Sequence, residues 1–141
     1  MKAGLTIILG ALALCLVAPG AKAQGRVEVK VTGRTDTGGA EPTCLLTFRL
    51  TNGGADRIGT FAGEFAAMDT SGAALQTVSR TVPFLGVPPG ASSEWSSAAV
   101  RNAHCDQVRL QIVRVACTGR CAPVAWAQEG LAGIEPPPAR R

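Results

Sequence analysis

Apolar and polar residues alternate with a period of two in several stretches of this chain, and this alternation limits the fold more than any other feature. In residues 26–33, Val27, Val29 and Val31 fall on one face and charged residues on the other. Such a period places successive side chains on opposite faces of a strand with one buried side. Similar runs predict strands in residues 44–54, 59–72 and 107–117.

Two further strands have weaker patterns. Residues 73–85 form an irregular run that Pro83 limits, and residues 93–100 follow a Pro-Pro-Gly corner. In the last strand the apolar face changes sides between Ile112 and Val113. One extra residue in a strand causes such a change, so a β-bulge is predicted there.

The spacing of these strands predicts the fold class. They recur about every 10 to 15 residues, separated by turns rich in Gly, Pro, Asn and Asp, which favours stacked antiparallel sheets over alternating strands and helices. We therefore expect an all-β, antiparallel, immunoglobulin-like sandwich of about six to seven strands.

The N-terminus has the pattern of a secretory signal peptide. Lys2 precedes the apolar run LTIILGALALCLVA, and Ala21 and Ala23 fit the small-residue positions of a cleavage site. Cleavage after Ala23 would start the mature chain at Gln24. The run is shorter than the roughly 20 residues that span a bilayer, so no stable membrane insertion is expected. Lipidation at Cys15 is an alternative, although Leu14 precedes it where a small residue is required.

The rest of the chain divides into residues 24–128, the predicted β-sandwich domain, and 129–141, a predicted flexible tail. The tail contains three consecutive prolines, which favour an extended chain. The whole chain of 141 residues has a formal charge of +4, and two of its lysines lie in the signal peptide. This weak charge does not indicate a nucleic-acid partner.

Residues 44–117 resemble the small immunoglobulin-like modules of secreted bacterial proteins, among them the FxLYD-type domains. The resemblance lies in an apolar strand ending in Asn-Gly, a second strand ending in Asp-Thr-Ser-Gly, and a Pro-Gly corner before a strand with Trp95. The chain departs from the pattern by having no tyrosine and by its extra cysteines. The resemblance implies a fold and leaves the role open.

Four cysteines follow the signal peptide, and an even number in an exported chain predicts disulfides. A continuous strand over residues 107–117 would hold Cys105 and Cys117 about 35 to 40 Å apart, too far to pair. Cys121 reaches back only about 14 Å, so it cannot meet Cys105 either. The remaining pairings are Cys44 with Cys105 and Cys117 with Cys121. In an immunoglobulin-like order, Cys44 and Cys105 would also lie at the same end of facing sheets.

Metal binding and thiol redox chemistry are the alternatives for these cysteines. His104, Cys105, Cys117 and Cys121 are ligand types suited to zinc or copper, and His104, Cys105 and Cys44 are a smaller set. The long strand separates the first set, and the second would need reduced thiols. Redox motifs usually have Cys-x-x-Cys at a helix start, whereas Cys117 and Cys121 have three residues between them at a strand end.

The chain has few residues suited to acid and base catalysis, with one histidine and no tyrosine. His104 precedes Asp106, but no nucleophile motif accompanies them. No cofactor is implied. We therefore expect a periplasmic or secreted, non-catalytic protein that binds or supports another envelope or secreted component. Arg120 and Trp126 are the candidate partner surface, and Trp126 fits either the core or a contact.

Overall fold

The computed structural model describes residues 25–121 and 123–139. The predicted signal peptide, its cleavage site and Cys15 lie outside these residues. In the part that is described, no helix has the length and apolar character needed to cross a membrane.

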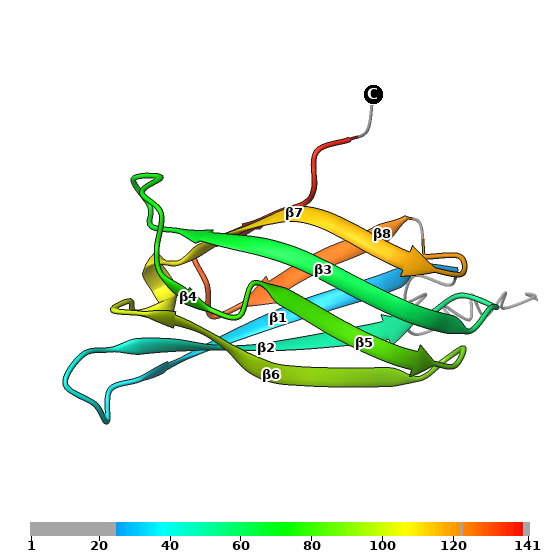
Figure 1. Cartoon of the computed structure of the whole chain (residues 1–141), viewed down its shortest axis with the longest axis horizontal. Helices are drawn as coiled ribbons and strands as arrows, with labels where there is room; N and C mark the ends of the chain where they lie inside the picture. Colours follow the sequence, from blue (N-terminus) through cyan, green and yellow to red (C-terminus); the bar gives the residue numbers. More distant parts are fainter. Residues whose placement is uncertain (1–24, 122, 140–141) are drawn as a thin grey trace, which may run out of the picture.

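The described chain forms two sheets that pack face to face (Figure 1). The first sheet contains, in spatial order, β4 (Thr77–Val78), β6 (Ser92–Arg101), β2 (Thr43–Asn52), β1 (Val27–Asp36) and β8 (Val124–Glu129). The second contains β5 (Thr81–Val87), β3 (Ile58–Met68), β7 (Arg109–Thr118) and β9 (Gly133–Glu135). The predicted all-β sandwich is confirmed.

The sheets differ from the prediction in number and direction of strands. Nine strands occur in the described residues, where six or seven were expected. The sheets are mixed, because β8 pairs with β1 in parallel and β9 pairs with β7 in parallel. Both parallel strands come from residues after the second disulfide loop, where the sequence pattern predicted no strand.

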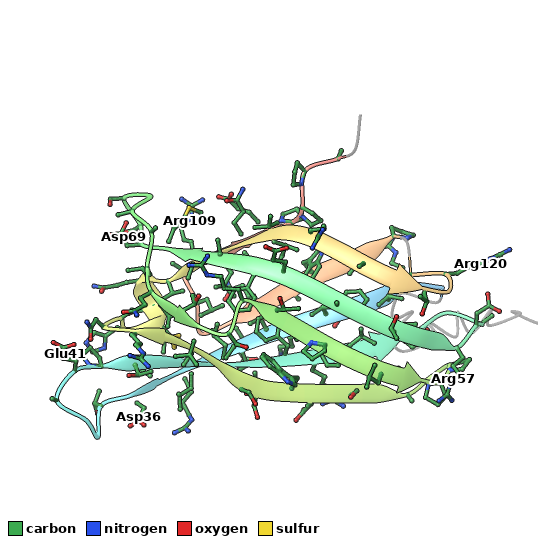
Figure 2. All side chains as sticks on the ribbon, in the orientation of Figure 1. Asp36, Glu41, Arg57, Asp69, Arg109 and Arg120 are labelled. Carbon is green, nitrogen blue, oxygen red and sulfur yellow. A yellow bond between two sulfur atoms is a disulfide. The ribbon has the colours of Figure 1, made fainter. Side chains whose placement is uncertain are left out.

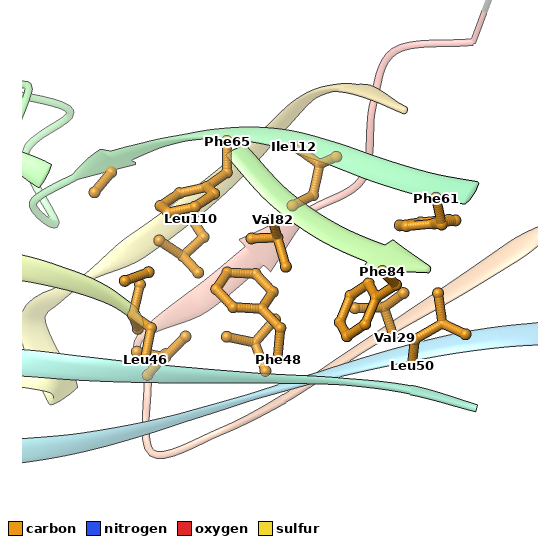
Figure 3. Close-up of a cluster of buried hydrophobic side chains, with 14 of the residues drawn as sticks. Val29, Leu46, Phe48, Leu50, Phe61, Phe65, Val82, Phe84, Leu110 and Ile112 are labelled. Atoms are coloured by element: carbon orange, nitrogen blue, oxygen red, sulfur yellow. The ribbon is translucent and has the colours of Figure 1, made fainter. Parts of the chain in front are cut away.

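The apolar residues that alternate in the sequence form the core between the two sheets. Val27, Val29 and Val31 of β1 are buried, and β2 pairs with β1 along its whole length. Aromatic side chains from both sheets meet in the centre, where the rings of Phe48 and Phe65 have centroids 5.2 Å apart (Figure 3). Burial of these faces supplies the main driving force for folding.

The predicted bulge lies in β7. Glu64 of β3 pairs with Arg114 and Phe65 pairs with Ile112, so Val113 is the extra residue. The side chain of Val113 is 47% exposed, while Ile112 is buried. The bulge therefore explains why the inward face of β7 changes from even to odd residue numbers.

The strand expected over residues 73–85 is divided in two. Ser79 has a positive φ of 63° between β4 and β5, which breaks the run. Pro83 lies inside β5 and does not end it. This is possible because β5 is an edge strand that pairs only with β3, so the missing N–H of Pro83 costs no ladder hydrogen bond.

The first part of the segment predicted to be a tail packs on the sandwich. Residues 129–141 were expected to be a flexible extension, but Leu131 is buried and residues 133–135 form β9. Gly130 makes the turn possible: its φ is +78°, and a Cβ there would lie 2.5 Å from the carbonyl oxygen of Gly33. The chain thus crosses from the first sheet to the second over the backbone of β1.

Asn52 is the one buried polar residue among those described. Its side-chain nitrogen donates to the carbonyl oxygens of Asp56 (2.8 Å) and Val87 (3.0 Å), and its side-chain oxygen accepts from the N–H of Gly54 (3.0 Å). It therefore joins the end of β2, the following loop and the end of β5. A side chain that satisfies three backbone groups, one through a buried and two through partly buried hydrogen bonds, fixes this end of the sandwich.

We expect Asn52→Ala to lower the free energy of unfolding by about 2 to 4 kcal/mol, because it leaves backbone groups unsatisfied in a buried site. Urea denaturation of the purified chain measures this loss. Thr51→Ala is the control, since its exposed hydroxyl meets only that of Ser92 and the cost should stay within about 0.5 kcal/mol. Equal losses for the two variants would contradict the role given to Asn52.

Candidate functional site

A groove of about 1020 Å³ opens between β8 and the second half of β7. Apolar side chains, the second disulfide and the start of the C-terminal segment form its walls. The lining residues include Val113, Val115, Cys117, Val124, Trp126 and Pro136.

The groove exists because β8 does not pair with the strand that precedes it. Strands that follow one another usually lie side by side. Here β8 crosses to the other sheet and pairs with β1, from Val27 with Val124 to Thr32 with Glu129. On its outer side, β7 pairs only through residues 109–111, with β9. Residues 113–118 thus have a strand partner on one side only within the described chain.

The free edge of β7 presents main-chain hydrogen-bonding groups. The N–H of Phe65 donates to the carbonyl oxygen of Arg80, so the backbone of β3 points away from β7 at this residue. Opposite residues in antiparallel strands alternate between hydrogen-bonded and unbonded pairs. Val115 and Cys117 lie opposite Gly63 and Phe61. These two residues lie two and four positions before Phe65, so their main-chain groups also point away from β7, and both pairs are unbonded. The N–H and C=O groups of Val115 and Cys117 therefore point toward the groove.

Trp126 belongs to both the core and the groove. Its ring centroid lies 6.5 Å from that of Phe61, and a Cβ built on Gly63 would lie 3.8 Å from the ring. The same side chain is only partly buried and lines the groove. The indole ring therefore packs against β3 in the core, and part of its surface also lines the groove; contact with a partner stays a prediction.

The two disulfides predicted from the sequence are present, and they lie at opposite ends of β7. Cys44 joins Cys105, with Cα atoms 4.9 Å apart, and links β2 of one sheet to the turn before β7 of the other. Cys117 joins Cys121, with Cα atoms 6.3 Å apart, and closes the loop after β7. The second bridge forms one end of the groove.

Arg120 lies outside the groove that Trp126 lines. Its side chain is 91% exposed at the tip of the disulfide loop, 3.9 Å from a carboxylate oxygen of Asp56 (Figure 2). Its neighbours Gly119 and Cys121 do line the groove. The predicted partner surface is therefore divided: Trp126 lies in a wall and Arg120 beside one end.

The candidate metal ligands do not come together. His104 is exposed beside Cys105, at the far end of β7 from Cys117 and Cys121. All four cysteine sulfurs form disulfides. Within residues 25–121 and 123–139, no three side chains of the types His, Cys, Asp and Glu form a cluster that would hold a metal ion.

Ion pairs occur on the outer faces of both sheets. Glu64 and Arg114, which both line the groove, approach to 3.3 Å on the outer face of their sheet. On the other sheet Lys30 lies 2.7 Å from Glu129, which ties β8 to β1. The hydrogen bond and charge of Lys30 hold the pKa of Glu129 below its usual value. This link is therefore kept near neutral pH and lost as the pH falls through that lowered pKa.

The sequence pattern did not predict β8, β9 or the groove. A signal for β8 was present, because Val124, Trp126 and Gln128 alternate with small residues, but the run is short and directly follows a disulfide loop. No comparable pattern exists for β9, which has three residues. Its position depends on the Gly130 turn and on the ion pair between Arg109 and Glu135.

Comparison of the chain with protein-family models, curated proteins and solved structures finds no match. The resemblance to FxLYD-type modules therefore stays a prediction. The groove is interpreted from the residues and geometry of this chain alone.

Removal of the two disulfides should cost different amounts of stability. The chain-entropy relation gives about 4 kcal/mol for Cys44–Cys105, which spans 61 residues, and about 2 kcal/mol for Cys117–Cys121, which spans 4. Urea denaturation of the double variants Cys44→Ala/Cys105→Ala and Cys117→Ala/Cys121→Ala measures both. A larger loss for the short loop would contradict this ranking.

Proposed function

We propose that this chain is an exported, non-catalytic binding protein that holds another envelope or secreted component in the groove between β7 and β8. The observation that carries the proposal is the unpaired edge of β7 beside the accessible face of Trp126. Main-chain groups and an aromatic side chain together provide affinity and orientation for a protein ligand.

The chemistry of the walls supports binding over catalysis. The apolar side chains of Val115, Val124 and Trp126 offer contact area. The charged lining residues in the described chain are Glu64 and Arg114, and they form an ion pair on the outer face. Cys117 and Cys121 serve here to close the end of the groove. We therefore propose a structural role for this disulfide and no redox activity.

Export is supported by the N-terminal pattern together with the two disulfides. Residues 1–23 have the charged start, apolar centre and Ala-x-Ala end of a signal peptide. Disulfides form and persist in oxidising compartments. We propose cleavage after Ala23 and a periplasmic or secreted location.

We also propose that the domain is an immunoglobulin-like module related to the FxLYD type. Three features support this: the bridge between β2 and the start of β7, the buried Asn52 at the end of β2, and the corner at Gly90 that leads into β6. The partly buried Trp95 of β6 packs on Phe48, with ring centroids 6.4 Å apart.

A charged side chain introduced into the groove should prevent the chain from retaining its partner. The mature chain is immobilised, and proteins retained from the extracytoplasmic fraction of the producing cells are quantified by mass spectrometry. We expect Val113→Glu to reduce retention of a specific partner at least about tenfold, since a carboxylate buried in an apolar contact costs more than about 1.4 kcal/mol.

Leu85→Glu is the matched control for this experiment. Leu85 is 76% exposed on β5, at the opposite edge of the same sheet, so its substitution leaves the groove intact. Thermal denaturation confirms that both variants are folded. Retention that is equal for the two variants, or absent for the unmodified chain, would overturn the proposed function.

A further inference from the structure

We propose that the ligand of the groove is an extended segment of a partner protein, which pairs as an additional strand with residues 113–118 of β7. The inference rests on the proposed function and specifies the kind of partner. It rests on two features that lie side by side: the unpaired main-chain edge of residues 113–118 in β7, and the apolar wall that Val124 and Trp126 of β8 form on the other sheet.

The edge of β7 already accepts a strand over its first half. β9 pairs there in parallel, from Arg109 with Gly133 to Gln111 with Glu135. Beyond the bulge, the main-chain groups of Val115 and Cys117 point toward the same side. Residues 113–118 extend about 20 Å at 3.3 Å per residue, which is the length of an ordinary strand. An incoming strand would continue the line of β9.

The chain cannot fill this edge with its own C-terminal segment. The next position of the β9 ladder falls on Pro136, and Pro137 and Pro138 follow. Proline has no N–H to donate to a ladder. Residues 136–138 accordingly border the groove, and residues 136–139 lead away from the sandwich (Figure 1). Among the described residues, none therefore pairs with this edge of β7, and the proposal assigns it to a segment of another molecule.

The opposite wall defines the side chains that the ligand needs. On the strand that would occupy this position, every second side chain faces the first sheet. There it would meet Val124 and Trp126, which line the groove from β8. The other side chains would project outward near Arg114, whose side chain is 70% exposed. The matching ligand is an extended segment with apolar residues at alternate positions and no proline among those that pair.

The test uses a peptide probe with this pattern, acetyl-Lys-Val-Thr-Val-Thr-Val-Lys-amide, and the nitrogen-15-labelled mature chain with both disulfides formed. Its control is the same peptide with the five internal nitrogens methylated, which keeps every side chain but removes the N–H donors of residues two to six. Amide hydrogen exchange at Val115 and Cys117 is followed by NMR.

With the unmethylated peptide at about ten times its dissociation constant, we expect exchange at Val115 and Cys117 to slow about tenfold. The methylated peptide should leave it unchanged. Equal binding of both peptides would show that side chains alone hold the ligand, and would overturn the proposal. Absence of slowing at about 1 mM peptide would do so too. If exchange at Val115 and Cys117 slows with rising protein concentration in the absence of peptide, a second copy of the chain occupies the edge. That result would also contradict the proposal.

A variant of the chain provides an independent test. In Pro136→Val/Pro137→Thr/Pro138→Val the C-terminal segment regains its N–H donors and can extend β9 along β7. We expect it to slow exchange at Val115 and Cys117 without peptide, and to weaken peptide binding at least about tenfold by competition. Unchanged exchange and unchanged binding would contradict strand pairing at this edge.

The outcomes separate this inference from the proposed function. Retention of a partner that Val113→Glu abolishes, without any effect of the strand-forming peptide on exchange, would keep the function and reject strand pairing. Protection by the peptide without retention of any partner by the unmodified chain would reject the function and leave the edge as an unused structural property.

Discussion

Main-chain hydrogen bonding along β7 determines both how this sandwich closes and where it stays open. The strand is paired on one side with β3 throughout. On the other side its first half pairs with β9, while its second half faces the groove. The division falls next to the bulge at Val113, which also reverses the inward face of the strand. One strand therefore carries the core, the groove wall and, at its two ends, the two disulfides.

Several local features together position β8 in the first sheet. The disulfide loop after β7 turns the chain within a few residues, since Cys117 and Cys121 are 6.3 Å apart at Cα. Trp126 then packs on Phe61 across the sandwich, and Lys30 holds Glu129 on the outer face. Gly130 allows the return over Gly33 to β9. The second disulfide is thus best understood as a constraint on the position of β8.

The sequence predicted the parts that depend on local pattern. Alternating apolar residues predicted β1, β2, β3 and β7, and the Pro-Pro-Gly corner predicted β6. The separation imposed by a long strand predicted both disulfides. The bulge followed from one change of face at Ile112 and Val113. What could not be predicted depends on partners distant in the chain: β8 and β9 pair in parallel with strands on different sheets, and Pro83 is tolerated only because β5 is an edge. The place of Trp126, against Phe61 and in the wall of the groove, also depends on the pairing of β8 with β1.

The strand edges of the two sheets are protected to different degrees, as β4, β5 and the open part of β7 show. An exposed strand edge invites unwanted pairing, and proteins usually protect it. β4 is only two residues long, and β5 contains Pro83. The edge of β7 beyond the bulge has neither device, and its own C-terminal segment is prevented from covering it by three prolines. A bulge lies at the start of this edge, and Trp126 and the second disulfide border the groove beside it. The proposed ligand, a single extended strand, would supply the pairing that this edge lacks within the described chain.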